Sequence, residues 1–273
     1  MFPIYDEIGE KYDTTRKADP FILQELGNLL DINQSYLQSC LYLDVACGTG
    51  NYTSEIAKVG GSWHAFDNSE KMLKEARNKS EIIKWDKFNI ESLGYNSNMF
   101  DGAICSLAIH HFPNLKLAFT EISRVLKANA NFVIFTATPE QMYSYWLCHY
   151  FPVMMELSCK QMQTLKQVEE SLFYAGFSVN DLKPFSITPN LKDFFLYSGK
   201  QRPEMYLNEK VRSGISSFHN FCTSSELKSG LKKLKKDIES GHILEIINRY
   251  QSSLGDYLFI QATKANKSLI SIF

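Results

Sequence analysis

Two glycines in the first third of the chain have the spacing of a ligand-binding turn. Gly48 and Gly50 follow the mainly apolar stretch 42–47 and precede sequence compatible with a helix. Glycine lets the backbone turn tightly and approach a ligand without a Cβ atom in the way, and a helix N terminus offers unpaired N–H groups. The pattern predicts a loop that holds a nucleotide-like molecule.

Three residues around this turn narrow the class of ligand. Thr53 stands where a dinucleotide-binding fingerprint would have its third glycine. Asp44 lies ahead of the turn, where a carboxylate would repel a pyrophosphate but could brace the loop or face a cationic ligand. Asp67 ends the second strand pattern, about 20 residues further on, where a carboxylate can accept both hydroxyls of a ribose. One ribose without a diphosphate indicates an adenosyl group that carries something small and positively charged.

Several motifs in sequence order resemble those of class I S-adenosylmethionine-dependent methyltransferases of the type 11 group. They are residues 43–50, 66–73, 88–93, 100–112, and 121–127 followed by 132–135. The resemblance spans roughly residues 40–137, and several motifs together are more specific than two glycines alone. It implies a doubly wound, seven-stranded Rossmann-like α/β sheet that binds S-adenosylmethionine and releases S-adenosylhomocysteine.

The resemblance also assigns positions to the cofactor. It places the methionine moiety at Gly48 and Gly50, the ribose at Asp67, and the adenine near Asn68, Asn89 and Ile90. The remaining positions expected around the cofactor are Asp44, Ala46, Met72, Ser106 and Leu107, with the last two beside the methionine end. Many relatives carry aspartate at position 89, but the amide of Asn89 can still accept a hydrogen bond from the adenine amino group.

The N-terminal segment 4–16 resembles the part of these proteins that folds over the cofactor. Arg16 could pair with the cofactor's carboxylate, because a guanidinium matches a carboxylate in a bidentate fork, and Tyr12 could hydrogen-bond to it. The alternative is that Arg16 pairs with a surface acid such as Asp13.

His110 and His111 follow the fourth strand pattern and are the candidate catalytic residues. A histidine at the mouth of the site could act as a general base, since its ordinary pKa lies near neutrality. The alternative is that one ring packs locally while the other lines the pocket.

Composition excludes several classes of protein. The chain has 273 residues, 44% of them hydrophobic, and a formal net charge of −1, which gives no electrostatic signature of a polyanion-binding protein. No run approaches the ~18–20 apolar residues that span a bilayer, and residues 1–7 lack the order of a signal peptide, so we expect a cytoplasmic protein. The six cysteines form no C-x-x-C pair and no metal-ligand spacing, so we expect reduced thiols and no metal.

Strand patterns alternate with helical ones, which is typical of a parallel sheet with crossover helices. Strand six is predicted at 177–185 and the final strand at 257–263, and about 70 residues separate them, too many for a simple loop. We therefore expect an N-terminal cofactor-covering segment and helix (1–30), a Rossmann-like core (31–188 and 255–265) and a mainly helical cap (189–254).

Two groups of residues outside the motifs have a structural interpretation that we favour. Apolar residues recur at helical spacing near residues 227–238, and the lysines between them are interpreted as a solvated helix face rather than an RNA-binding surface: Lys228, Lys232, Lys233, Lys235 and Lys236. The aromatic segment 143–151 is expected to pack in the core or the cap, with substrate contact as the alternative.

The predicted function is methyl transfer to a small metabolite or biosynthetic intermediate enclosed by the cap. One alternative is a tRNA wobble-nucleotide methyltransferase, against which the neutral charge and the cap argue. A second alternative is a cofactor-binding subunit without catalytic activity. The identity of the methyl acceptor and the oligomeric state are not predicted.

Overall fold

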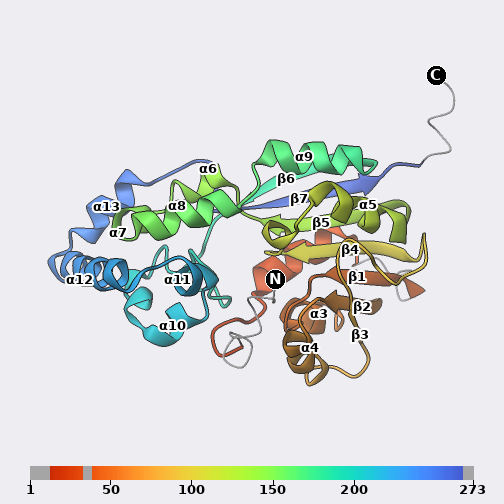
Figure 1. Ribbon diagram of the computed structural model, residues 1–273, viewed down its shortest axis with the longest axis horizontal. Helices are drawn as coiled ribbons and strands as arrows, with labels where there is room; N and C mark the ends of the chain where they lie inside the picture. Colours follow the sequence, from red (N-terminus) through yellow and green to blue (C-terminus); the bar gives the residue numbers. More distant parts are fainter. Residues whose placement is uncertain (1–12, 33–38, 267–273) are drawn as a thin grey trace.

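The computed structural model describes residues 13–32 and 39–266, and Tyr12 lies outside them. A seven-stranded sheet fills one half of the molecule, and helices beyond one end of its strands form the other half (Figure 1). The strand order is β3 (Lys84–Lys87), β2 (Ser62–Asp67), β1 (Leu41–Val45), β4 (Phe100–Ser106), β5 (Leu126–Thr136), β7 (Tyr257–Lys264) and β6 (Phe177–Phe185). The predicted doubly wound fold is confirmed.

The sheet has one antiparallel strand, β7, between β5 and β6, and the pairs from β3 to β5 are parallel. The chain enters the sheet at β1 and winds first toward β3, then from β4 toward the other edge. Ligands of such sheets bind beyond the carboxyl ends of the strands where the order reverses. Here that point lies between β1 and β4.

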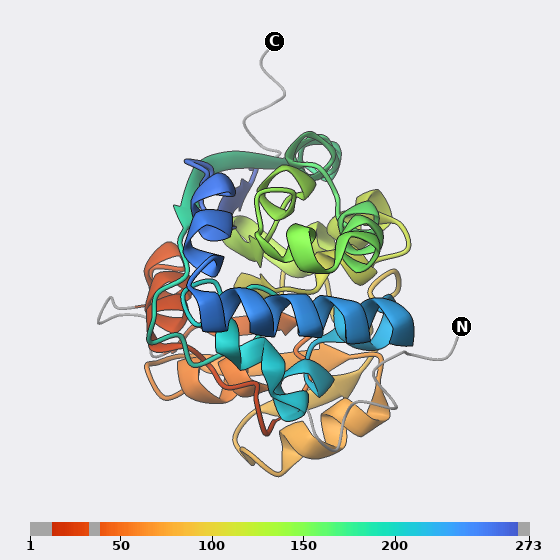
Figure 2. The ribbon, with the colours of Figure 1, turned by 90° about the vertical axis from the view of Figure 1, so that its left-hand side faces the viewer.

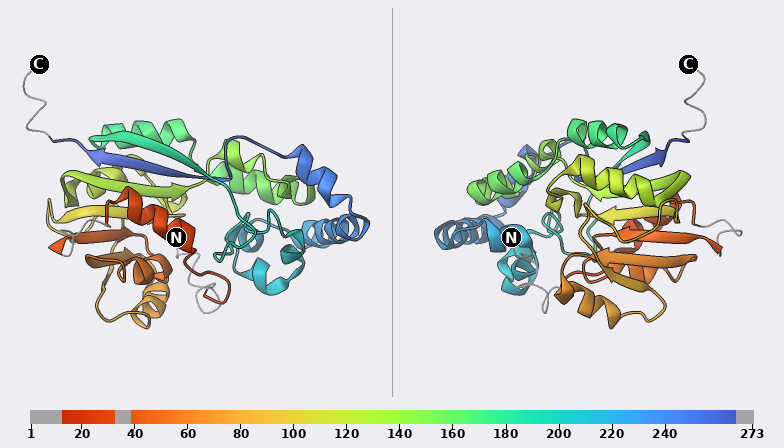
Figure 3. Two further views of the ribbon diagram at one scale, coloured as in Figure 1. Left: turned by 180° about the vertical axis from the view of Figure 1, so that it is seen from behind. Right: turned by 45° about the vertical axis from the view of Figure 1, so that its right-hand side comes forward.

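Alternation of side chains along the strands divides the core into two layers. Tyr42 and Val133 belong to the cluster that includes α2 (Pro20–Leu29) and α3 (Asn51–Ile56). Their neighbours Leu43 and Ile134 belong to the cluster that includes α5 (Leu115–Val125) and α9 (Leu165–Tyr174). Successive residues of a strand point to opposite faces, so strands with apolar residues at nearly every position become buried on both sides. Figure 3 shows helices on both faces of the sheet.

Local sequence signals set the ends of the flanking helices. Asp19 caps α2 by accepting hydrogen bonds from the backbone N–H groups of Phe21 and Ile22 at 3.0 and 3.4 Å. α4 (Glu70–Arg77), which follows β2, is capped in the same way by Ser69. α9 ends shortly before Gly176, whose φ of 83° lies in the left-handed region, as predicted for this helix.

The cap is built from two segments of the chain. The insertion between β6 and β7 supplies η4 (Pro203–Leu207), α10 (Glu209–Ser213), α11 (Ser216–Asn220), α12 (Ser224–Ser240) and α13 (Ile243–Arg249). The connection between β5 and β6, which we expected to belong to the core, supplies α6 (Pro139–Met142), α7 (Leu147–Tyr150) and α8 (Pro152–Gln161). α12 contacts α7, and α11 contacts α8. Figure 2 shows α12 lying across this end of the molecule.

α12 is amphipathic as the spacing of its apolar residues predicts. Leu234 is fully buried, and Leu227, Leu231 and Ile238 are half-buried against the cap. The five lysines noted in the sequence are all exposed, as expected for a solvated face. Within the described residues, no helix combines the length and the apolar character needed to cross a membrane.

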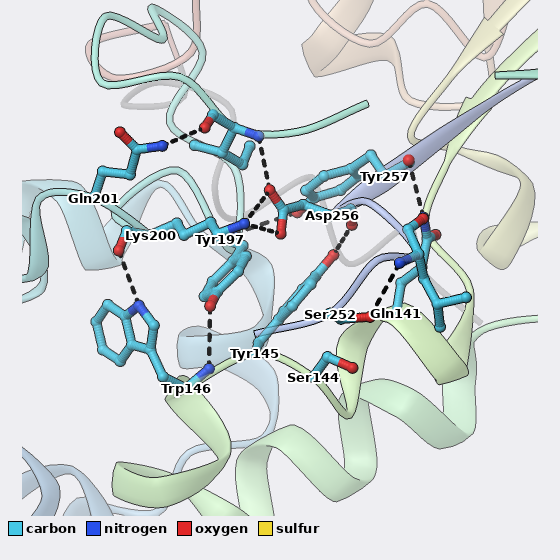
Figure 4. Close-up of polar contacts among 12 residues, drawn as sticks. Gln141, Ser144, Tyr145, Trp146, Tyr197, Lys200, Gln201, Ser252, Asp256 and Tyr257 are labelled. Atoms are coloured by element: carbon cyan, nitrogen blue, oxygen red, sulfur yellow. Dashed lines mark hydrogen bonds and ion pairs between the residues drawn. The ribbon is translucent and has the colours of Figure 1, made fainter. Parts of the chain in front are cut away.

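A buried polar cluster joins the cap to the start of β7 (Figure 4). The Asp256 carboxylate pairs with the Lys200 ammonium at 2.7 Å and accepts the backbone N–H of Ile187 at 2.7 Å. The Tyr145 ring stacks on the Tyr197 ring with centroids 3.8 Å apart. The cluster thus connects residues from both cap segments to the strand that returns into the sheet. The packing predicted for the aromatic segment holds for Tyr145 and Trp146, which are buried, and is wrong for Tyr143, which is 55% exposed.

The six cysteines all lie in the described ranges and are free thiols. Burial raises the pKa of Cys105 well above its ordinary value and that of Cys159 to about 12. Both thiols therefore stay protonated at neutral pH, as expected for small buried hydrophobes.

Candidate functional site

A cavity of about 400 Å³ lies at the carboxyl ends of the strands, at the switch point of the sheet. Twelve of the fifteen predicted site residues line it: Arg16, Asp44, Ala46, Gly48, Asp67, Asn68, Met72, Asn89, Ile90, Ser106, Leu107 and His111. Of the other three, Gly50 belongs to the turn but faces Trp85 and does not line the cavity, His110 lines a neighbouring cavity, and Tyr12 lies outside the described residues.

The turn after β1 is held in a conformation that few residue types adopt. Ala46, Gly48 and Gly50 have φ values of 55°, 56° and 70°, all in the left-handed region. Such a conformation costs a residue with a Cβ of order 1–2 kcal/mol, so Ala46 is strained, as functional sites often are. The turn is fixed by hydrogen bonds from Cys47 N to Phe66 O and from Gly50 N to Cys47 O, both 2.9 Å.

The two glycines of the turn are needed for different reasons. A Cβ on Gly50 would lie 2.4 Å from Cη2 of Trp85, so packing inside the protein excludes any larger residue there. A Cβ on Gly48 would meet no protein atom within 4 Å, and Gly48 lines the cavity. The missing side chain of Gly48 therefore leaves space for a ligand to approach the backbone.

Two carboxylates flank this turn. Asp67 accepts hydrogen bonds from Gly48 N at 2.9 Å and from Ser69 N at 2.8 Å, so both of its oxygens are oriented by backbone. Asp44 is buried and accepts a 2.5 Å hydrogen bond from the hydroxyl of Thr53. Thr53, which replaces the third glycine of a dinucleotide fingerprint, thus has its own task of holding Asp44. Burial raises the pKa of Asp44 to about 7.

The part of the cavity next to β3 and α4 is lined by apolar side chains and two amides. Phe88, Asn89 and Ile90 line it after β3, together with Asn68, which precedes α4, and Met72 from its first turn. Asn89 Oδ1 accepts a local hydrogen bond from Glu91 N at 3.1 Å, which fixes the side chain. A flat heterocycle with polar edges matches this end.

The exit of β4 forms the opposite wall and borders a second cavity. Leu107 has a φ of 53° and donates its backbone N–H to Phe135 O at 2.7 Å. Leu107 and Arg16 line both the large cavity and a smaller one of about 90 Å³. The hydroxyl of Ser106 is buried without a hydrogen-bond partner in the described structure. The two cavities therefore share a wall at the end of β4.

The paired histidines lie in η3 (Ile109–His111) with ring centroids 3.9 Å apart and face different cavities. His111 lines the large cavity and His110 the small one. Nδ1 of His110 is buried without a hydrogen-bond partner among the described residues. Burial, with His111 adjacent, lowers the pKa of His110 well below its ordinary value, and burial lowers that of His111 to about 4. Both imidazoles are therefore neutral at physiological pH.

Arg16 pairs with Asp193, which lies in the irregular segment between β6 and η4, and not with Asp13. Asp13 instead pairs with Lys79 at 2.6 Å and accepts hydrogen bonds from Thr49 and Asn51. These contacts attach the N-terminal segment to the turn after β1.

Ten cavity residues were not predicted from the sequence. They are Cys47, Thr49, Asn51, Tyr52, Phe66, Phe88, Ala108, Phe112, Pro113 and Asp193. Nine of them lie within or next to the recognised motifs and could have been included on that basis. Asp193 has no local sequence signal, because only the tertiary fold brings it to Arg16.

The residues present fit S-adenosylmethionine. The cradle at Gly48 would be filled by any Cβ, the oriented carboxylate of Asp67 suits ribose hydroxyls, and the end lined by Asn89 suits adenine. At the other end, Arg16 is positioned for a carboxylate and the buried Asp44 for a cationic group.

Comparisons with known proteins agree with this fit. A family model described as "Methyltransferase domain" matches residues 43–134. The chain is 28% identical over 232 residues to a demethylmenaquinone methyltransferase of Staphylococcus aureus, covering 79% of this chain and 90% of that protein. It is 30% identical over 157 residues to the biotin biosynthesis bifunctional protein BioHC of Teredinibacter turnerae, covering 51% of this chain but 26% of that protein.

A solved structure resembles most of the chain. A protein of Anabaena variabilis described as a methyltransferase from an antibiotic biosynthesis pathway superposes with a TM-score of 0.80 and 29% identity, covering 91% of this chain and 99% of that one. The matched domain, the structural match and the cavity at the switch point support the assignment of this chain as a class I S-adenosylmethionine-dependent methyltransferase.

Proposed function

We propose that this methyltransferase modifies a small acceptor whose reacting end enters the smaller cavity. The observation that carries the proposal is the shared wall. Arg16 and Leu107 border both cavities, so a donor in the large cavity and an acceptor in the small one would lie next to each other. Proximity and orientation supply much of the rate in such a transfer.

Donor binding is assigned to the residues around the large cavity. Asp67 would accept the ribose hydroxyls, Asn68, Asn89 and Ile90 would contact the adenine, and Arg16 would pair with the carboxylate. Gly48 would let the backbone approach the methionine end, with Ala46, Asp44, Met72, Ser106 and Leu107 completing the wall. S-adenosylmethionine supplies, when bound, a methyl group already activated by its sulfonium.

The walls of the small cavity indicate the kind of acceptor. Most are apolar, among them Met142, Met162, Phe195 and Phe221, and Arg16 is the one charged side chain among those that line it. Its volume of about 90 Å³ is below the ~150 Å³ that holds a benzene ring. We infer that a weakly polar group of the acceptor enters, while the rest of the molecule extends toward the cap.

His110 is the residue we assign to the acceptor. Its neutral imidazole lines the small cavity, and its buried Nδ1 lacks a partner among the described residues. An acceptor hydroxyl or amine would satisfy this nitrogen, which holds the nucleophile in place. A histidine of such low pKa is a weak base, so positioning is its main contribution.

The names of the relatives point to several acceptor classes. The Staphylococcus aureus protein is named for demethylmenaquinone and the Anabaena variabilis protein for an antibiotic pathway. Both kinds of molecule are small compared with a nucleic acid, which supports a small-molecule acceptor for this chain without selecting one.

The test is a transfer assay with methyl-tritiated S-adenosylmethionine. The enzyme is incubated with a low-molecular-weight cell extract or with total tRNA, and Asp67→Ala serves as the matched inactive control. We expect label in the small-molecule fraction that is lost in the control. Label in tRNA would contradict the proposal, and donor binding without transfer to either fraction would instead favour a non-catalytic subunit.

A further inference from the structure

A buried ion pair lies in the wall of the large cavity, which we assign to the donor and call the donor cavity. Arg16 Nη2 donates to Asp193 Oδ2 at 3.2 Å, and Arg16 Nε also contacts Asp193. The Tyr52 hydroxyl donates to Asp193 Oδ2 at 3.2 Å. Asp193 is only 1% exposed, yet it lines the large cavity beside Arg16.

We propose that Asp193 binds the α-ammonium of the donor while Arg16 binds its carboxylate. The proposal rests on the proposed function of the large cavity. An α-amino acid carries a positive and a negative group on one carbon, and a guanidinium beside a carboxylate presents the complementary pair. Hydrogen bonds between ionised groups are the strongest of their kind, and burial of one partner, as for Asp193, strengthens them.

The pair is poorly explained as a stabilising contact alone. A buried ion pair loses so much solvation that apolar residues often stabilise a fold equally well. Its place in a cavity wall, next to the residues that face the cationic end of the ligand, gives it a function in recognition.

Asp193 reaches the donor because its segment is attached to the N-terminal one. Lys192 N donates to Asp19 Oδ2 at 2.9 Å, and Phe194 N donates to Thr15 O at 3.0 Å. These two hydrogen bonds hold the segments side by side (Figure 3). The segment that leads into the cap thereby supplies one ligand of the donor.

Asp19 provides a matched control for a purely structural role. Like Asp193 it is 1% exposed and ties the same two segments together, but it lines neither cavity. If Asp193 only attached the segments, Asp19→Asn and Asp193→Asn would change ligand binding in the same way.

The experiment is calorimetric titration of S-adenosylhomocysteine and of 5′-methylthioadenosine, which lacks the amino-acid end. We expect Asp193→Asn to weaken S-adenosylhomocysteine roughly tenfold to a hundredfold, as for a hydrogen bond between charged groups, and to leave 5′-methylthioadenosine unchanged. Asp19→Asn should lower the melting temperature and keep the ratio of the two affinities.

The proposal would be overturned if Asp193→Asn lowered the affinity for both ligands equally, or lowered the affinity for neither. A second arm needs no variant: the wild-type enzyme should bind the deaminated analogue of S-adenosylhomocysteine at least roughly tenfold more weakly than S-adenosylhomocysteine itself. Equal affinities would overturn the proposal even if Asp193→Asn failed to fold. A wild-type protein that binds none of these ligands would contradict the proposed function instead.

Discussion

The two cavities that share Leu107 in their walls differ in how their lining residues are spread along the chain. Apart from Arg16 and Asp193, the donor cavity is lined by residues 44–113, where successive strands end at one edge of the sheet. The smaller cavity, which we propose for the acceptor, is lined by residues scattered from Arg16 to Tyr257. Both cap segments and β7 bring them together. On the proposed assignment, donor recognition depends mainly on one continuous part of the sequence, whereas acceptor recognition depends on how the cap packs.

The first prediction contrasts the two glycines of the donor turn. Gly50→Ala should destabilise the protein by roughly 2–5 kcal/mol, because left-handed strain adds to a clash with Trp85. Gly48→Ala should cost only about 1–2 kcal/mol, from strain alone. Thermal or urea unfolding of both variants measures these costs.

Gly48→Ala, the variant with the smaller expected loss of stability, is the one that should impair ligand binding directly. The Cβ added at Gly48 occupies donor space, so Gly48→Ala should weaken S-adenosylhomocysteine although the protein stays folded. If Gly48→Ala bound the ligand normally, the backbone of the turn would not approach it as we describe.

The second prediction concerns pH and the charge of the donor. Asp44 has a pKa of about 7, and a sulfonium nearby would favour its ionised form and lower that pKa. Affinity for S-adenosylmethionine should then fall as the pH drops below about 7, by up to about tenfold per unit. S-adenosylhomocysteine, whose sulfur is neutral, should show little change.

Calorimetry at pH 8, 7 and 6 with both ligands tests this difference. Asp44→Asn should abolish the pH dependence of S-adenosylmethionine binding. Identical pH profiles for the two ligands in the wild type would show that Asp44 does not sense the sulfonium.

The third prediction contrasts the two histidines across the cavity boundary. His110→Ala should lower kcat/KM for the acceptor roughly tenfold, as for one lost hydrogen bond, and leave donor affinity unchanged. His111→Ala, in the donor cavity, should change donor affinity. The acceptor fraction identified by the tritium assay serves for both measurements, and an unchanged kcat/KM in His110→Ala would remove His110 from the acceptor site.

The sequence was sufficient for the donor half of the molecule because its signals are local. Gly48, Asp67 and the strand ends after them lie within a few residues of recognisable motifs, and the parallel sheet aligns them at one edge. It was insufficient for the cap. Residues 139–161 lie between two strands of the core, so the sequence pattern assigns them to the core. Their packing against α11 and α12 makes them part of the cap. Likewise, Asp13 is close to Arg16 in the sequence, but the partner of Arg16 in the structure is Asp193, 177 residues further on.

The central claim is that the cavity at the switch point holds the donor around Asp67. Titration of S-adenosylhomocysteine into the wild type, Asp67→Ala and a control tests it most directly. Asp101→Ala is the matched control, because Asp101 also accepts a backbone N–H, from Leu41 at 2.9 Å, but lines neither cavity. We predict binding by the wild type and Asp101→Ala, and a loss of roughly a hundredfold or more in Asp67→Ala. No binding by the wild type, or equal binding by all three proteins, would contradict the claim.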